Sequence, residues 1–377
     1  MIRVLFVAPH PVEGPSSRFR IYQFLPYLRA NGVHAEVRPF VSSRHVQALY
    51  QSGGIARKVA LTGFATLNRA MDVLRATRYD VVYVLREAFP FGPPLFERAL
   101  AAAGGRLVFD FDDAIWLPSQ VYDNPLDRAR DWGKPAKLVA RARHVVVGSR
   151  YLADFAEKYA VHPDAISIIP TVVDSTVYKP SNKTREDGSL TIGWVGTPRG
   201  SRAFLETLVP VMRDFAVRYP HVRWRFVGAE PFDVGSLPVE FKTWRLADEV
   251  ADIQSFDIGL MPLTDDPYTR GKCGFKLIQY MNCGMPVVCS PVGANRDIVQ
   301  HGLCGYFADD VAQWSDALAR LIEDSSLRNA MGAHGRTLAE ERYSLAAQAP
   351  RLLEVIRAVA QPSGARNYSS PSGKTTF

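Results

Sequence analysis

The chain of 377 residues has few cysteines and no long apolar run. No stretch approaches the ~18 consecutive apolar residues of a membrane-spanning helix. The opening run IRVLFVA is short and is followed by a loop, unlike a signal peptide, so we expect the chain to stay in the cytoplasm. The cysteines lack the paired spacing of a metal site, which predicts free thiols, no disulfide and no zinc. They are Cys273, Cys283, Cys289 and Cys304.

The sequence also lacks a zinc finger and the aromatic and basic motifs of RNA-binding domains, so we predict no nucleic-acid partner. Its positive charge is unevenly placed. Residues 1–173 hold 22 Lys and Arg against 15 Asp and Glu, and residues 174–377 hold 23 of each, so the whole excess of +7 is N-terminal. Such a basic half can face an anionic membrane surface, which leaves open a peripheral place on the inner face of the membrane.

Short apolar runs alternate with amphipathic segments along most of the chain, which predicts an α/β fold class with parallel, doubly wound sheets. With 47% hydrophobic and 22% charged residues, the chain is globular and long enough for two domains. The expected strands are 2–8, 33–40, 80–85, 107–111, 144–148, 166–169, 191–196, 222–227, 241–246, 258–263 and 286–289. The expected divisions are a domain at 1–173, a linker at 174–189, a domain at 190–345, a helix at 346–362 and a disordered tail at 363–377.

The stretch from 271 to 293, GKCGFKLIQYMNCGMPVVCSPVG, predicts a helix followed by a buried strand. Gly284 stands where a left-handed residue would end the helix. The free N–H groups at the helix start suit an anion such as phosphate, Gly274 allows it to come close, and Lys276 adds a charge. An ordinary crossover helix with one solvated lysine is the alternative interpretation.

This stretch resembles the donor-site signature of GT-B glycosyltransferases of family 4 (group 1), which reads Glu-Gly-Phe-Gly and then Glu-Ala-Met-Ala-Cys-Gly-x-Pro-Val-Val. In that family two Glu residues eight positions apart hold the donor sugar and the ribose. Here Gly271 takes the first position and Gln279 the second. Lys276 and Gln279 also match the sub-pattern Lys-x-x-Glu/Gln-Tyr, whose lysine lies close to the donor diphosphate. The resemblance implies two Rossmann-like domains facing a cleft, with the acceptor on the N-terminal side.

A second part of the resemblance is WVGTPRGSR, which is similar to the family's strand and loop whose Gly, Arg and Lys line the diphosphate site. These positions are Gly196, Thr197 and Arg202 in this sequence. The resemblance therefore implies that Arg202 and Lys276 face one diphosphate pocket from opposite walls. The loop from Arg245 to Glu249 lies where the family places the base.

The loop after the first strand is the third expected part of the donor site. Ser16, Ser17 and Arg18 stand where a loop meets a helix, a place that can hold phosphate and that the family fills with a Gly-rich loop. Capping of the helix by either serine is the alternative. Pro26 is expected to bend this helix or to end it early. The expected donor-binding residues are Ser16, Ser17, Arg18, Gly196, Thr197, Arg245, Glu249, Gly274, Phe275 and Gln279.

Charged residues follow two expected strands, at the edge of a parallel sheet where ligands bind. Arg86 and Glu87 follow one strand, and Asp110, Asp112 and Asp113 end another. Both phrases resemble a subset of the same glycosyltransferases, so we expect Arg86, Glu87 and Asp110 to contact the acceptor. Asp112 and Asp113 are expected to act in catalysis beside the two cations named above. The alternatives are the metal-binding Asp-x-Asp of GT-A enzymes and simple capping of a turn.

The segment 55–78 predicts a basic amphipathic helix. Val59, Leu67, Met71 and Leu74 share one face, and the basic residues of the segment outnumber Asp72. Such a helix can lie in a bilayer interface. Packing of this apolar face against the core, with the basic face in solvent, is the interpretation that we favour.

Family membership implies a hexosyltransferase-type enzyme that moves a sugar from a nucleoside diphosphate sugar to an acceptor hydroxyl with retention of configuration. The resemblance implies no metal and no cofactor, and a last helix that crosses back to the first domain. The expected acceptor is a carbohydrate or a lipid-linked molecule in cell-surface polysaccharide, glycolipid or glycoconjugate synthesis. A nucleotide-sugar epimerase and a catalytically silent nucleotide-sugar-binding protein are the alternatives on the same fold.

Overall fold

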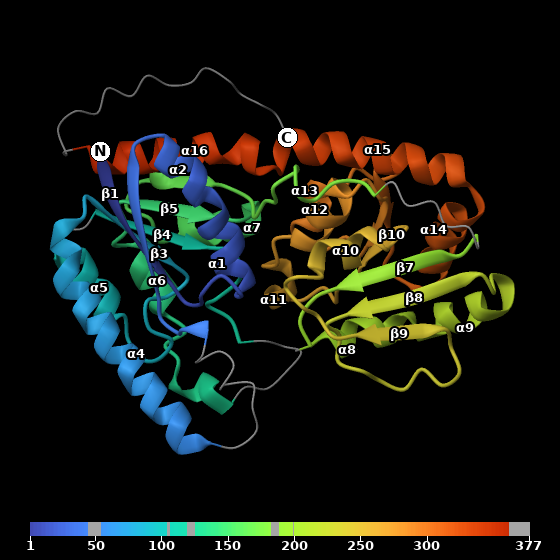
Figure 1. The fold of residues 1–377 in the computed structure, drawn as a ribbon, viewed down its shortest axis with the longest axis horizontal. Coiled ribbons are helices and arrows are strands. Elements are labelled where there is room, and N and C mark those ends of the chain that lie inside the picture. The colour runs from blue at the N-terminus through green and yellow to red at the C-terminus, as the bar shows by residue number, and fades with distance from the viewer. Residues whose placement is uncertain (44–53, 104–105, 119–124, 182–187, 199, 362–377) are drawn as a thin grey trace.

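The computed structural model describes residues 1–43, 54–103, 106–118, 125–181, 188–198 and 200–361. In this part of the chain there are two parallel sheets of six strands each, with apolar cores on both faces (Figure 1). The strand orders are β2-β1-β3-β4-β5-β6 and β12-β11-β10-β7-β8-β9. The predicted α/β fold with two doubly wound domains is confirmed.

The first domain is built around β1 and β3, whose apolar side chains are buried because helices cover both faces of the sheet. Its strands are β1 (Ile2–Ala8), β2 (Val33–Pro39), β3 (Val81–Leu85), β4 (Arg106–Phe111), β5 (His144–Val147) and β6 (Ile166–Ile168). Its helices are α1 (Pro15–Arg20), α2 (Leu25–Ala30), α4 (Ile55–Arg75), α5 (Leu95–Ala102), α6 (Lys134–Val139) and α7 (Arg150–Glu157).

The second domain repeats this plan around β7 and β10. Its strands are β7 (Leu190–Val195), β8 (Val222–Val227), β9 (Val239–Lys242), β10 (Ile258–Met261), β11 (Val287–Cys289) and β12 (Gly305–Phe307). Its helices are α8 (Ser201–Leu205), α9 (Val209–Arg218), α10 (Glu249–Gln254), α11 (Pro267–Arg270), α12 (Phe275–Asn282), α13 (Asn295–Ile298), α14 (Val311–Glu323) and α15 (Ser325–Arg342). Strand β12 was not expected from the sequence, because its residues Gly305, Tyr306 and Phe307 begin with glycine and do not form the run of β-branched residues that marks β11.

The helix expected after β1 is divided in two. A short 3-10 turn at Tyr22–Phe24 separates α1 from α2, and Pro26 lies in the first turn of α2. A proline is tolerated there because its missing N–H would have no partner within the helix. The break therefore comes before Pro26, and not at or after it as the sequence pattern predicts.

The last helix, α16 (Leu345–Ala360), carries the chain back onto the first domain (Figure 1). Its Leu352 and Ile356 are buried in the core that contains β1 and α2. Where the chain returns, the N–H of Leu345 donates to the carbonyl of Val173 over 2.8 Å, and the N–H of Val173 donates to the carbonyl of Tyr343 over 3.4 Å. The outgoing and returning crossings between the domains are thus hydrogen-bonded to each other.

Three remaining expectations concern the linker and tail, the cysteines and membrane-spanning helices. Residues 182–187 of the expected linker and the expected tail at 363–377 lie outside the described residues. All four cysteines are buried and unpaired. In the described part of the chain, no helix combines the length and the apolar character that crossing a bilayer requires.

Candidate functional site

A pocket with about 560 Å³ of empty space, including solvent at its mouth, lies between the two domains. It is bordered by α1, which follows β1, by the loop after β4 and by the start of α12. All three follow the carboxyl ends of parallel strands, where ligands of such sheets bind. The lining residues are Pro15, Ser16, Phe19, Asp112, Asp113 and Thr171 from the first domain and Met261, Lys272, Cys273, Gly274, Phe275 and Lys276 from the second.

The second-domain wall of the pocket is the N-terminus of α12. Gly274 precedes the helix with a φ of 62°, in the left-handed region that favours glycine. A Cβ on Gly274 would lie 2.3 Å from the Ile298 Cδ1, so a larger residue would require this side chain to shift. The first N–H groups of α12 have no acceptors within the helix, and they lie at the end of the helix that borders the pocket. A bound anion requires such free donors. Gly284, with a φ of 73°, follows the helix as predicted.

Two lysines add full positive charge at this wall. Burial, and then the neighbouring Lys272, lower the pKa of Lys276 from 10.5 to about 8. The Lys276 ammonium lies 5.2 Å from the centre of the Trp194 ring. Gly196 makes room for this lysine, because a Cβ there would lie 2.9 Å from the Lys276 Cε and closer still to Trp194. An anion bound beside this ammonium would therefore raise the pKa of Lys276 toward its usual value.

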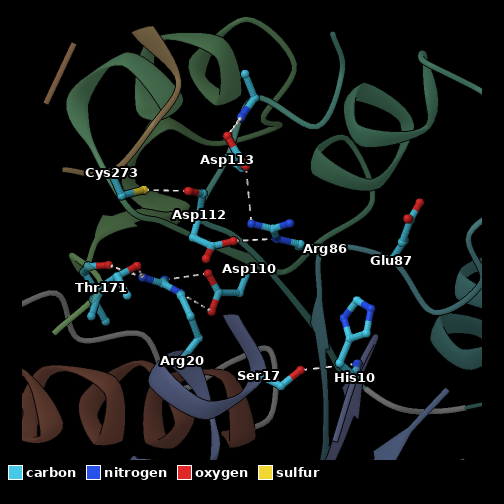
Figure 2. Close-up of polar contacts among 12 residues, drawn as sticks. His10, Ser17, Arg20, Arg86, Glu87, Asp110, Asp112, Asp113, Thr171 and Cys273 are labelled. Atoms are coloured by element: carbon cyan, nitrogen blue, oxygen red, sulfur yellow. Dashed lines mark hydrogen bonds and ion pairs between the residues drawn. The ribbon is translucent and has the colours of Figure 1, made fainter. Parts of the chain in front are cut away.

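The first-domain wall is acidic, but its carboxylates are paired with Arg86 (Figure 2). Arg86 Nε donates to Asp112 over 2.6 Å and a terminal nitrogen donates to Asp113 over 3.5 Å. Burial alone would raise the pKa of Asp112, but Arg86 and Arg20 outweigh burial and the pKa falls. Arg86 has a φ of 59°, a conformation that costs a non-glycine residue free energy and is concentrated at functional sites.

Asp110 does not reach the acceptor side as the sequence pattern predicts. Both of its oxygens accept from Arg20, over 2.9 and 2.5 Å (Figure 2). Tyr83 Oη also donates to it over 2.6 Å. The carboxylate is completely buried. Asp110 is therefore a structural residue, because an internal arginine neutralises it before any ligand could.

The same pairing bears on the Asp-x-Asp alternative. Asp110 is neutralised by Arg20 and Asp112 by Arg86, so neither carboxylate has the uncompensated charge that a divalent cation prefers. Among the described residues, no group of three or more potential metal ligands is gathered in one place.

Only one of the three residues expected in the loop after β1 lines the pocket. Ser16 borders it and donates a hydrogen bond to Asp112. Ser17 is completely buried, and its hydroxyl accepts from the N–H of His10 over 3.3 Å. Neither serine caps α1, so the capping alternative is wrong. Arg18 turns away from the pocket and pairs with Glu249 of the second domain over 2.7 Å.

Glu249 is the centre of a buried network, not an open base site. Its carboxylate accepts from Arg18, from Trp244 Nε1 over 2.9 Å, from Tyr178 Oη, and from Gln279 Nε2 over 3.3 Å. Gln279 is itself buried, so the amide expected to hold the ribose is occupied by Glu249. The Arg18 guanidinium also lies 4.4 Å from the Phe19 ring centre. In this conformation Arg18, Glu249 and Gln279 hold the domains together and do not line the pocket.

Arg202 is not brought to the pocket. Its guanidinium pairs with Glu206, one turn along, and its side chain is 55% exposed. Thr197 and Arg245 are also exposed and do not border the pocket in the described part of the chain. The structure thus does not place Arg202 opposite Lys276 at the pocket, and Arg202 pairs with its helical neighbour Glu206 on the solvent side.

This chain has Gly271 and Gln279 at the two positions where the family has glutamate, and their surroundings differ. A Cβ on Gly271 would lie 2.3 Å from the Ala114 Cβ, so the close approach of the domains leaves no room for a side chain at this position. At position 279, the Gln279 amide donates to Glu249 of α10 over 3.3 Å.

Glu87 lies one residue beyond Arg86 and is not a pocket wall. It accepts from Arg130 over 2.9 Å, and burial, the largest influence, raises its pKa. A contact between Glu87 or Arg86 and an acceptor stays a prediction.

Several residues of the site were missed from the sequence. Lys272 brings a second cation, and Phe19 brings an aromatic ring whose centre lies 4.4 Å from that of the expected residue Phe275, across the domain boundary. His10 follows β1, and burial and then Arg86 lower its pKa to about 4, which keeps it neutral near pH 7. The signal for Lys272 was present in GKCGFK, directly before the helix. The aromatic contact could not be found, because its partners are 256 positions apart, from 19 to 275.

Two family profiles match the chain. "Glycosyltransferase Family 4" matches residues 18–177, and "Glycosyl transferases group 1" matches residues 189–324. The chain belongs to the group 1, family 4 glycosyltransferases. The first range contains β2 to β6 of the first sheet and the second contains the whole second sheet, so the family is recognised in both domains.

Curated relatives in the family match over limited lengths. The D-inositol 3-phosphate glycosyltransferase of Corynebacterium jeikeium is 29% identical over 138 residues, which are 36% of this chain and 31% of the relative. The enzyme of the same name from Pseudarthrobacter chlorophenolicus is 22% identical over 234 residues, 56% of this chain and 54% of the relative. The matches thus span about half or less of these relatives.

Among solved structures, Anabaena HepE in complex with UDP and glucose is similar over 95% of this chain and 100% of its own. The TM-score is 0.69 at 17% sequence identity. This likeness confirms the predicted GT-B fold.

Proposed function

We propose that the protein is a retaining glycosyltransferase that moves a sugar from a nucleoside diphosphate sugar to an acceptor hydroxyl without a metal ion. The observation that carries the proposal is the convergence of Lys272, Lys276 and the N-terminus of α12 on one pocket wall. Such a wall complements a diphosphate, and the carboxylates of Asp112 and Asp113 face the same space. Family membership supports the transfer of a sugar.

The proposed reaction breaks the bond between the anomeric carbon and the diphosphate oxygen. The acceptor oxygen attacks from the same face, and its proton passes to a phosphate oxygen of the departing nucleoside diphosphate. Lys272, Lys276 and the helix N-terminus stabilise the charge that develops on this leaving group, a contribution of about 3 kcal/mol for each such donor in well-studied sites. Asp112, held by Arg86, orients the sugar or the acceptor hydroxyl.

The positive charges at α12 and the arginine pairs at the strand ends support chemistry without a divalent ion or another cofactor. UDP is the first nucleotide to test, because HepE was solved with it. The relatives are named for D-inositol 3-phosphate, a phosphorylated polyol, which supports a polar acceptor. We further propose a carbohydrate or lipid-linked acceptor in cell-surface polysaccharide, glycolipid or glycoconjugate synthesis, with the protein peripheral at the inner face of the membrane.

The first test of this proposal is ligand binding. Thermal denaturation with UDP, GDP, ADP and dTDP should show one nucleotide that raises the melting temperature by mass action. Lys276→Met should lose this rise, and Lys158→Met, at an exposed lysine in the first domain, should keep it.

The second test is analysis of the product. Incubation of the sugar donor of that nucleotide with a polyol or glycoside acceptor should give a product with the donor's anomeric configuration by NMR. Binding without transfer would indicate a silent nucleotide-sugar-binding protein. Release of an epimerised sugar would indicate an epimerase. An inverted product would contradict the retaining mechanism while leaving glycosyl transfer in place.

A further inference from the structure

The helix α4 buries polar side chains and exposes apolar ones, which is the reverse of an ordinary surface helix. Ala65, Arg69, Asp72 and Ala76 follow helical spacing at its end and are buried. The stripe on the other side is apolar and exposed: Phe64 is 65% exposed, Leu67 67%, Met71 47% and Leu74 68%. We call these four residues the α4 stripe; Val59, at 65% exposure, extends it toward the N-terminus. Monomeric proteins rarely expose a continuous row of this kind without a partner for it.

The buried side explains why the apolar side faces outward. Arg69 pairs with Asp72 over 3.1 Å and donates to the carbonyls of Ala88, Arg38 and Ala8 over 2.9, 3.2 and 3.3 Å. These bonds fix the rotation of α4 about its axis. Packing of the apolar face against the core, the interpretation favoured from the sequence, is therefore wrong.

The charge around the stripe is of one sign. Arg57 and Arg78 are exposed and the Arg75 side chain is 40% exposed. Asp72 is the one acidic residue in the sequence from 55 to 78, and it is buried. A second copy of the chain placed on the stripe by two-fold symmetry would bring these arginines against one another. An anionic surface has the complementary charge.

We propose that α4 is an interfacial membrane helix, which inserts the α4 stripe among the acyl chains of an anionic bilayer while its arginines contact the lipid phosphates. Helices of this type lie in the plane of the interface and bind through apolar insertion and electrostatic attraction together. The proposal deepens the peripheral location proposed above, and it rests on the proposed function only for the lipid-linked nature of the acceptor.

The position of α4 relates the membrane to the candidate site. Figure 1 shows α4 on the outer side of the first domain, away from the second domain. The carbonyls that hold Arg69 belong to Ala8, the last residue of β1, and to Ala88, two residues beyond Arg86. The helix is thus attached to the sheet edge that carries Arg86 and Asp112. A bilayer under α4 would bring a lipid-linked acceptor to this edge.

Vesicle co-sedimentation of the full chain tests the proposal. The protein should pellet with vesicles of phosphatidylcholine and phosphatidylglycerol at low salt, and less at high salt because exposed charges are screened over ~8 Å. The double change Leu67→Gln with Leu74→Gln should weaken this binding by about tenfold or more, since each leucine loses its insertion. Val217→Gln is the matched control, because Val217 is 84% exposed in the second domain. Arg57→Gln with Arg78→Gln should reduce both the binding and its salt dependence, whereas Arg213→Gln should not.

A labelled variant reports insertion directly. Since all four natural cysteines are buried, Phe64→Cys can be labelled selectively with an environment-sensitive dye. Its emission should shift to the blue with anionic vesicles, and the emission of Val217→Cys should not.

Two results would overturn the proposal. One is equal vesicle binding by the wild type and the Leu67→Gln/Leu74→Gln variant, or no binding by either. The other is a wild-type dimer in light scattering that this variant dissociates, which would make the stripe a contact between copies. The variant should retain nucleotide binding and transfer to a soluble acceptor, so a failure of the membrane proposal is distinguishable from a failure of the proposed function.

Discussion

Replacement of Lys276 by methionine should stabilise the protein while removing nucleotide binding. The folded protein lowers the pKa of Lys276 from 10.5 to about 8, mainly through burial. Keeping this ammonium charged at pH 7 therefore costs folding about 3 kcal/mol. The contact of the ammonium with the Trp194 ring offsets about 1 kcal/mol of this cost. Methionine keeps most of the apolar contact, so Lys276→Met should gain about 1–2 kcal/mol and raise the melting temperature by a few degrees.

The pH dependence gives this prediction a second, independent check. The unfolded lysine keeps its proton up to about pH 10, whereas the folded one loses it near pH 8. The stability of the wild type therefore rises with pH in this window, and the advantage of Lys276→Met, full below pH 8, should shrink toward pH 10. Calorimetry of both proteins at pH 7 and pH 10 measures the difference. Lys158→Met, at an exposed lysine, should give no such advantage.

Nucleotide binding should change in the opposite direction. UDP, or whichever nucleotide binds, should stabilise the wild type and have at least about tenfold lower affinity for Lys276→Met, because a charge-assisted contact is lost. In the wild type this affinity should fall as pH rises through about 8, where Lys276 loses its proton. A variant that is less stable than the wild type at pH 7, or that binds nucleotide normally, would refute the reasoning.

Three further predictions follow from the contacts around the pocket. Arg20→Ala should lower the free energy of unfolding by about 3–5 kcal/mol in urea, because Asp110 is left as an unpaired buried charge; a loss below ~1 kcal/mol would contradict its structural role. Lys272→Ala should lower kcat/KM by about 10-fold to 100-fold, and its effect should be non-additive with that of Lys276→Ala. Arg202→Ala should change kcat/KM little. A larger loss from Arg202→Ala than from Lys272→Ala would place Arg202 in the site. A chelator should leave turnover unchanged, and loss of turnover with rescue by Mg²⁺ or Mn²⁺ would support the Asp-x-Asp alternative.

The sequence predicted the fold because the fold depends on local patterns. Apolar runs and helical spacing placed most strands, and the pair Gly274 and Gly284 located both ends of α12 to within two residues. The strand expected at 241–246 was displaced, since β9 spans Val239–Lys242. Short, half-buried edge strands of this kind have little apolar pattern to mark them.

The candidate site was less predictable, because it depends on which charged groups meet across the fold. Asp110 and Asp112 are two residues apart and look equivalent in sequence. Only Asp112 lines the pocket, because Asp110 is buried in its pair with Arg20. The pairing of Arg202 with Glu206 was visible as a spacing of four, but the resemblance alone directed the arginine to the pocket. The periodicity of α4 identified an apolar stripe. Its outward direction follows from the long-range bonds of Arg69, which no periodicity contains.

The mutual hydrogen bonds of the two domain crossings restrict how the pocket can open. Val173 on the outgoing chain bonds to Tyr343 and Leu345 on the returning chain, so the two connections act as one pivot. Sliding of one domain along the other would break these bonds, whereas rotation about Val173 keeps them. Rotation must instead break contacts between the two domains, among them the pair of Arg18 with Glu249 and the bond from Cys273 Sγ to the Asp112 carbonyl. A rotation that opens the pocket would therefore have to separate Arg18 from Glu249.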